Sequence, residues 1–268
     1  MDERGEMYMK RIKKYLWLLL VFSFVLTLGV HAKEESIHWF CTRNKEHKQP
    51  LADPSLRFVE KYDGYYIDHR HGDGEEDKVI YLTFDAGYEN GNIEKILDVL
   101  KEEQVPGAFF VLKNLILKNG ELISRMIDEG HLICNHTASH KDMTKCTSLE
   151  EFKTELETLE TIYFDATGQK MAPYYRPPEG KFNETGMKYA QELGYKTVFW
   201  SFAYADWDNE RQMSPEEAKK KILSHIHNGE VMLLHPTSAT NAAVLKDVIR
   251  ELKQEGYRFG TLDELTAK

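Results

Sequence analysis

From residue 78 onward, short apolar runs alternate with segments in which apolar residues recur at helical spacing. Residues 93, 96, 97 and 100 are apolar and fall on one face of a helix, and residues 122, 123, 126 and 127 repeat this pattern. Strands that alternate with helices predict a parallel sheet with helical crossovers. The predicted strands are Val79–Phe84, Gly107–Leu112, His131–Cys134, Pro173–Tyr175, Thr197–Trp200, Val231–Leu234 and Tyr257–Gly260.

About seven parallel strands favour an α/β fold of the distorted (β/α) barrel type over an open doubly wound sheet. No glycine-rich phosphate-binding motif follows any run, which argues against a nucleotide fold. Ser148 with Glu151 predicts a capping box at the start of a long helix. Ser214 followed by Pro215 predicts a second helix start, because proline is favoured at the first helical position.

The first 32 residues are typical of a signal peptide. A basic start at Lys10–Lys14 precedes the apolar run Tyr15–Val30, and Val30–Ala32 resembles a small-residue cleavage site. We expect residues 1–32 to be cleaved, with an uncleaved anchor as the alternative. In both cases the rest of the chain is exported, and this segment makes a transient membrane contact.

Residues 33–77 are polar and predict an irregular N-terminal segment that packs on the main domain, 78–268. Near its end, His69 and His71 alternate with Asp and Arg. These histidines belong either to a solvated loop, which we favour, or to a metal site.

The 268-residue chain has a net charge of -9, which argues against nucleic acid as a partner because phosphate binding needs a basic surface. A neutral glycan or a peptide is compatible with this charge. Cys41, Cys134 and Cys146 are odd in number and have no C-x-x-C spacing, so we expect no disulfide framework. Cys134 lies inside an apolar run and predicts a small buried side chain rather than a catalytic thiol.

Polar residues directly follow five of the predicted strands, and their types fit one chemistry. Catalytic groups of parallel α/β barrels lie at the C-terminal ends of the strands. Together these residues predict a hydrolytic site with a carboxylate, a divalent metal and a protonated histidine. They are Asp85, the pair His136 and His140, Arg176, Asp206 and His235.

Each of these residues also has a structural interpretation. Asp85 is either a general base or the cap of the turn that follows it. His136 and His140 are spaced so that a helical turn would place both imidazoles on one side, as in a divalent-metal site, although such pairs also occur by chance. Arg176 precedes two prolines that restrict the backbone, and it is either aimed at Asp85 or exposed on a turn.

Asp206 and His235 suggest an acid whose proton is held by a neighbouring carboxylate. If they pair, Asp206 would raise the pKa of His235 and keep the ring protonated. Trp200, Tyr204 and Trp207 offer flat faces on which sugar rings stack, or they fill the end of the barrel as core.

These motifs resemble those of the NodB-homology polysaccharide deacetylases, the family-four carbohydrate esterases, over about residues 78–268. Two segments are more similar to one branch, the delta-lactam-biosynthetic de-N-acetylases, which act on muramic acid in spore cortex peptidoglycan. The N-terminal stretches Ile37–Trp39 and Glu60–Tyr66 are also similar to that branch. The similar segments are Thr83–Asp85, His136–His140, Arg176–Gly180, Asp206–Trp207 and Leu233–His235 for the family, and Thr83–Gly91 and Tyr195–Ser201 for the branch.

The resemblance implies removal of N-acetyl groups from peptidoglycan glycan strands. Asp85 would be the base, held by Arg176. His136 and His140 would bind a divalent metal, zinc in the first place, and His235 tuned by Asp206 would protonate the leaving amine. In this branch an amidase first removes the stem peptide, and the freed amine then closes a lactam. The residues implied in substrate binding are Trp207, Tyr204, Trp200 and Tyr88.

Position 86 departs from the family pattern. Most members carry there a second aspartate that ligates the metal, whereas this chain has Ala86. Two protein ligands then remain where catalytic zinc usually has three, and water, Asn135 or a substrate oxygen would complete the site. We therefore expect metal dependence that is weak or absent, or a glycan-binding pseudoenzyme, with activity favoured by the retained acid and base.

Two rival functions remain open at this point. One is deacetylation of another substrate, namely N-acetylglucosamine in peptidoglycan, chitin oligomers or acetylated xylan. The other is a non-catalytic wall-binding module, which Ala86 supports and the acid–base set opposes. A metalloprotease is a distant third, because the histidine pair lacks the His-Glu-x-x-His pattern.

Overall fold

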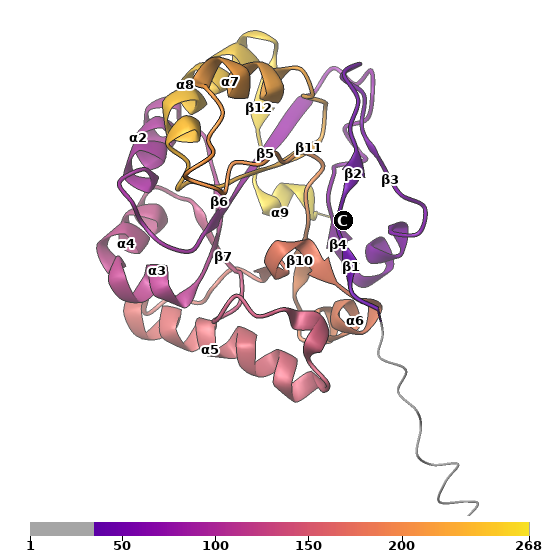
Figure 1. Ribbon diagram of the computed structural model, residues 1–268, viewed down its shortest axis with the longest axis vertical. Coiled ribbons are helices and arrows are strands. Elements are labelled where there is room, and N and C mark those ends of the chain that lie inside the picture. Colours follow the sequence, from indigo (N-terminus) through magenta and orange to yellow (C-terminus); the bar gives the residue numbers. More distant parts are fainter. Residues whose placement is uncertain (1–34, 268) are drawn as a thin grey trace, which may run out of the picture. The chain divides into compact units, whose positions relative to one another are not determined.

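Eight strands form one parallel sheet that curls into a distorted barrel, with helices along its outer side (Figure 1). The computed structural model describes residues 35–267, so the predicted signal peptide, residues 1–32, lies outside the described residues. The strand order is β11-β5-β6-β7-β8-β10-β4, and β12 pairs with the start of β5. These strands are β4 (Gly64–Tyr65), β5 (Lys78–Ala86), β6 (Ala108–Val111), β7 (Leu132–Asn135), β8 (Tyr174–Tyr175), β10 (Lys196–Val198), β11 (Glu230–Leu234) and β12 (Tyr257–Phe259).

The predicted alternation of strands and helices is confirmed, and all seven predicted strands are present. Two short helices, α3 and α9, gave no clear periodicity in the sequence because they span six and four residues. None of the helices within residues 35–267 is long and apolar enough to cross a membrane. The helices are α2 (Ile93–Glu103), α3 (Lys113–Lys118), α4 (Gly120–Asp128), α5 (Leu149–Thr167), α6 (Glu184–Glu192), α7 (Pro215–Leu223), α8 (Ala239–Gln254) and α9 (Leu262–Leu265).

Helix starts follow the sequence signals with one exception. Ser148 caps α5 by accepting from the backbone N–H of Glu151 at 3.2 Å. The reciprocal half of the predicted capping box is wrong, since the Glu151 carboxylate accepts from the backbone N–H of Thr147 instead. Ser214 and Glu217 at the start of α7 form the complete reciprocal pair.

Alternation along β5 separates two cores. Ile80, Leu82 and Phe84 pack outward against the helices, and Val79 and Tyr81 pack inside the barrel. A residue that continues the inward-facing series at the end of such a strand therefore points its side chain to the rim of the barrel. The polar residues predicted to be functional occupy this rim.

The N-terminal segment contributes more structure than its composition indicates. Its strand β4 pairs in parallel with β10, and an isolated bridge joins Ile67 to Glu230 of β11. A strand of two residues gives no alternation in the sequence, which is why it was missed. The boundary at residue 77 stays a prediction. The remaining short elements are β1 (Ile37–His38), β2 (Cys41–Thr42), β3 (Leu51–Ala52) and β9 (Lys181–Phe182), and the 3-10 helices η1 (Arg57–Tyr62), η2 (Met143–Lys145) and η3 (Pro178–Gly180).

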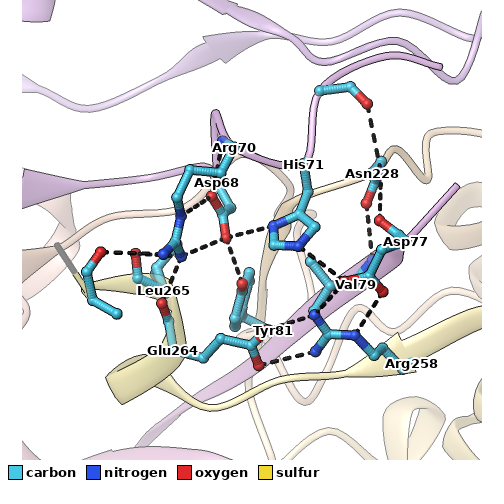
Figure 2. A network of polar contacts seen from close by, with 12 residues as sticks. Asp68, Arg70, His71, Asp77, Val79, Tyr81, Asn228, Arg258, Glu264 and Leu265 are labelled. Atoms are coloured by element: carbon cyan, nitrogen blue, oxygen red, sulfur yellow. Dashed lines mark hydrogen bonds and ion pairs between the residues drawn. The ribbon is translucent and has the colours of Figure 1, made fainter. Parts of the chain in front are cut away.

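A polar network joins this segment to the amino-terminal ends of the strands (Figure 2). The buried Asp68 carboxylate accepts from Tyr81 Oη at 2.6 Å and lies 2.9 Å from His71 Nδ1. The other ring nitrogen of His71 lies 3.1 Å from Asp77, which Arg258 also binds. His71 is therefore a bridge between two carboxylates within the fold.

Candidate active site

Six strands or their following loops supply the walls of one cleft of about 700 Å³ at the C-terminal ends of the strands. Eight of the ten site residues predicted from the sequence line it, and the other two, Arg176 and Asp206, lie directly behind it. Asp85 and His235 thus face the same cleft, as the catalytic interpretation requires. The lining residues are Asp85, Gly87, Tyr88, Leu112, His136, His140, Glu179, Trp200, Ala203, Tyr204, Trp207, Leu233, His235 and Thr237.

Asp85 is the penultimate residue of β5, and its carboxylate is held on one side. Arg176 Nη1 donates to Asp85 Oδ1 at 2.8 Å, and Asp85 Oδ2 lies 3.6 Å from His136 Nε2. Burial opposes ionisation of this carboxyl, but His136 and Arg176 outweigh it and hold the pKa of Asp85 below its ordinary value. Asp85 is therefore an ionised carboxylate with one oxygen fixed and the other turned toward the imidazole pair.

Arg176 is fully buried directly behind the cleft. Its guanidinium donates to Thr83 Oγ1 at 2.9 Å and to the carbonyls of Val198 and Phe199, and it lies 4.1 Å from the centre of the Phe110 ring. Every side of the group is occupied, so it has one orientation. The predicted pairing of Arg176 with Asp85 is therefore present in the structure. The alternative prediction, an exposed arginine on a turn, is wrong.

His235 follows β11 and is paired with the buried Asp206. Its Nδ1 lies 2.7 Å from Asp206 Oδ1, and its backbone N–H donates to Asp206 Oδ2 at 2.8 Å. Burial disfavours a charged ring, but the hydrogen bond and charge of Asp206 outweigh burial and raise the pKa of His235 above its ordinary value. The second ring nitrogen, Nε2, is left for the cleft.

Asn241 was missed by the sequence analysis. Its side-chain amide donates to Asp206 Oδ2 at 2.6 Å and to the His235 carbonyl at 3.0 Å, and its side-chain oxygen accepts from Tyr204 Oη. It is a fully buried residue in the first turn of α8. The available signal in the sequence was an asparagine shortly after the polar end of a predicted strand, beside the apolar face of the helix that follows.

The loop that carries His136 and His140 is not the helical turn that their spacing suggested. Thr137 and His140 have left-handed backbones, with φ of 71° and 58°. This path brings the two ring centroids to 5.1 Å and turns both rings into the cleft. The pairing was predicted correctly, but its geometry comes from two strained residues rather than from helical periodicity.

The donor atoms available to a divalent ion are fewer than a complete site needs. His136 Nδ1 lies 2.9 Å from the Arg176 carbonyl, which leaves Nε2 as its free donor. Ala86 is fully buried in the outer apolar core, and both ends of the Asn135 amide are bound within the protein. Within residues 35–267 no three His, Cys, Asp or Glu residues come together to hold an ion. The residues therefore fit two imidazole ligands and not the usual three.

Aromatic side chains form the outer part of the cleft. Trp207 is 62% exposed and Tyr88 is 46% exposed, so both offer faces to a ligand. Trp200 lies against Gly180, where a Cβ would come within 2.7 Å of its ring, and this contact fixes the indole. Tyr204 lines the cleft but is buried, and its hydroxyl is used by Asn241.

Comparison with known proteins identifies relatives of this arrangement. Residues 72–198 match the family described as polysaccharide deacetylase. The peptidoglycan-N-acetylmuramic acid deacetylase PdaA of Bacillus subtilis is 40% identical over 86% of this chain and 86% of its own length. The solved structure of Bacillus subtilis PdaA, a family 4 carbohydrate esterase, has a TM-score of 0.81 at 40% identity and covers 86% of this chain and 97% of that chain.

Two further relatives mark the range of functions nearby. A peptidoglycan-N-acetylglucosamine deacetylase of Bacillus cereus is 33% identical over 70% of this chain and 88% of its own length. A CE4 family pseudoenzyme from Bacillus anthracis has a TM-score of 0.64 at 27% identity, covering 71% of this chain and 66% of that chain, and a mutant of it has restored enzymatic activity. With these matches, the chain belongs to the polysaccharide deacetylase family.

Proposed function

We propose that this protein is a hydrolase that removes N-acetyl groups from peptidoglycan glycan strands, with N-acetylmuramic acid as its sugar. One observation carries the proposal: an ionised Asp85 and a His235 with a raised pKa face the same cleft from different strands. Acid and base on two sides of a bound amide are what amide hydrolysis requires. The 40% identity to an N-acetylmuramic acid deacetylase supports the choice of sugar.

Asp85 would act first, as the general base. Its carboxylate takes a proton from a water molecule while the water oxygen forms a bond to the acetamide carbonyl carbon. Arg176 holds Oδ1 and leaves Oδ2 for this transfer. Because the guanidinium is immobilised by Thr83 and two carbonyls, Asp85 is aimed before substrate arrives.

His235 would complete the reaction as the general acid. As the bond between the carbonyl carbon and nitrogen breaks, Nε2 gives its proton to the nitrogen, so that acetate and a free amine are the products. Asp206 keeps the ring protonated and fixes which nitrogen faces the cleft, and Asn241 fixes Asp206. Asp206 and Asn241 are thus positioning residues for His235.

A divalent ion, zinc in the first place, would be held by His136 and His140 and would polarise the acetamide carbonyl. Because the protein offers two imidazoles and Ala86 in place of a third ligand, we propose that this ion binds weakly or is dispensable. The proton transfers assigned to Asp85 and His235 do not depend on it.

The substrate and the place of action follow from the same proposal. The exposed faces of Trp207 and Tyr88, with Trp200 and Tyr204 deeper in the cleft, would hold the sugar rings. The protein would act outside the cytoplasm, in the cell wall or spore cortex, after export through residues 1–32 and their transient membrane contact. An amidase would act first, because a free lactyl carboxylate is needed for the later lactam.

Product mass from defined glycan strands tests this function. Peptide-free muramic acid strands should lose an acetyl group, and loss of acetyl plus water would mark lactam closure. Strands that keep their stem peptides, and strands in which only N-acetylglucosamine can react, are the comparison substrates. Release of acetate from glucosamine alone would contradict the choice of sugar.

A non-catalytic role is the second candidate, and Ala86 is the observation that favours it. The presence of a CE4 family pseudoenzyme among the structural neighbours supports keeping it. Titration calorimetry with glycan beside the acetate assay separates the two functions. Binding without acetate release, with and without added Zn²⁺, would favour the wall-binding role.

A further inference from the structure

We propose that Glu155 of α5 is a positioning residue that holds His140 in the cleft. This inference rests on the proposed function, because it assigns a role to the imidazole pair of that site. The backbone of residues 136–140 is strained, so groups outside this loop must keep it in place.

The loop is costly in isolation. Thr137 is β-branched and has φ of 71°, and His140 has φ of 58°. Residues in such sparsely populated conformations are destabilised and persist only where their surroundings hold them. Thr137 Oγ1 is also buried without a hydrogen-bond partner. The contacts around the loop must therefore offset this cost.

Glu155 makes most of those contacts from one turn of α5. Its carboxylate accepts from Ser139 Oγ at 2.9 Å and from the Ser139 backbone N–H at 3.2 Å. Its backbone carbonyl accepts from the N–H of Ala138 at 3.2 Å. A single residue of α5 thus fixes the two loop positions directly before His140.

The other end of the loop has a separate anchor. The Asn135 side chain accepts from the Thr137 N–H at 2.9 Å and donates to the Leu156 carbonyl at 3.0 Å. His136 itself is held by the carbonyl of Arg176. The first imidazole therefore keeps its place without Glu155.

His140 has no such hold of its own. Within the described part of the chain, its ring makes no hydrogen bond, and its ring centroid lies 5.1 Å from that of His136. Its position in the cleft is then set by its backbone, and that backbone is fixed through Ser139 and Glu155. Loss of the Glu155 carboxylate should release His140 and leave His136, Asp85 and His235 where they are.

The test compares Glu155→Ala and Glu155→Gln with Ser139→Ala and the double variant Ser139→Ala/Glu155→Ala. Glu157→Ala is the matched control, since Glu157 lies on the same helix, is ion-paired with Lys153 and has no contact with the loop. The ring signals of ¹⁵N-labelled histidines are measured by NMR, alone and during titration with Zn²⁺. Acetate release from peptide-free strands, as kcat and KM, shows whether the rest of the site is intact.

Glu155→Ala should lower the affinity of the imidazole pair for Zn²⁺ about 10–100-fold, the usual effect of removing a group that orients a ligand, while kcat without added metal stays within about twofold of wild type. The His140 ring signals should shift or broaden while those of His235 stay. Glu155→Gln keeps an acceptor oxygen and should recover most of the loss. The double variant should lose less than the product of the single effects, because both changes break one contact.

Unchanged His140 ring signals with a Zn²⁺ affinity within about twofold of wild type in Glu155→Ala would overturn the inference. If Glu155→Ala does not fold, Ser139→Ala decides, since it removes the hydroxyl contact to the Glu155 carboxylate and should shift the His140 signals in the same way. A wild-type protein that releases no acetate would defeat the proposed function alone, because the NMR arm would still report on His140.

Discussion

Within residues 35–267, two clusters pair an aspartate of low exposure with arginine, and one of them borders a cleft. At the amino-terminal ends of the strands, Asp68 binds Arg70 and His71 (Figure 2). At the carboxyl ends, Asp85 binds Arg176. Both oxygens of Asp68 accept hydrogen bonds, from Arg70 on one side and from Arg70 and Tyr81 on the other. Identical residue types can thus form a closed network.

Asp85 differs because its network is half open. One oxygen is bound by Arg176, and the other lies 3.6 Å from His136 Nε2, beyond hydrogen-bond distance. The cleft supplies the space for a water molecule or substrate at that oxygen. A saturated cluster contributes stability, and a cluster with one unfilled acceptor beside a cleft is suited to proton transfer. Substitutions in the two clusters should therefore affect different properties, turnover in one and stability in the other.

The largest effect is expected at the open cluster. Asp85→Asn keeps the shape of the side chain but removes the base, so acetate release should fall about 10²–10⁴-fold. Circular dichroism confirms that the variant is folded. Turnover within tenfold of wild type would assign the base to another group.

The closed cluster should respond in stability rather than in turnover. Asp68→Asn removes the charge that binds the half-exposed Arg70 and should lower the free energy of unfolding by about 1–2 kcal/mol, measured in urea. The folded fraction should keep the wild-type kcat. A large loss of kcat at unchanged stability would mean that the two clusters are coupled.

The pKa of Asp68 predicts the direction in which pH changes the stability of this closed cluster. Burial opposes ionisation, but hydrogen bonds from Arg70, Tyr81 and His71 outweigh it and lower the pKa of Asp68 to about 2. The stability it contributes is therefore present above the ordinary pKa of an aspartate and is lost as pH falls toward about 2. Asp68→Asn should lack this part of the acid transition.

Asp206→Asn should have a smaller effect, concentrated at alkaline pH. In the wild type the raised pKa keeps His235 protonated, and kcat should fall as pH rises through that pKa. Without the Asp206 charge the pKa of His235 falls. The decline of kcat at alkaline pH then begins at a lower pH, and activity near pH 7 drops about tenfold. Asp208→Asn, a half-exposed aspartate in the same loop, is the control. An unchanged decline of kcat at alkaline pH in Asp206→Asn would remove Asp206 from this role.

Metal removal should have the smallest effect. With two imidazole donors and a buried Ala86, exhaustive chelation should change acetate release less than about twofold. Re-addition of Zn²⁺ controls for non-specific effects of the chelator. Complete loss on chelation with full recovery by Zn²⁺ would show that an ion is essential despite the incomplete donor set.

Strand ends were predictable because apolar runs are visible in the sequence and parallel strands bring their ends together. Asp85, Arg176 and His235 were found in this way. Asn241 was not, since its role depends on where α8 starts relative to Asp206 in space. No pattern along the chain encodes that distance.

The histidine loop shows a second limit. Spacing predicted that His136 and His140 would lie together, but the backbone that achieves this uses left-handed residues, and φ is not visible in spacing. Glu155 was missed for the same reason, because its partner Ser139 is 16 residues away. Strand β4 was missed because two residues show no alternation.

The contacts of Arg70 bear on how the barrel comes together. Its guanidinium donates to the carbonyls of Glu264 and Ala267, 194 and 197 residues away along the chain. Contacts of such high sequence separation close large loops, and folds that depend on them assemble slowly. Removal of the last few residues would delete these acceptors. The N-terminal segment would then lose the hydrogen bonds of Arg70 to the end of the chain, although every catalytic side chain is still present.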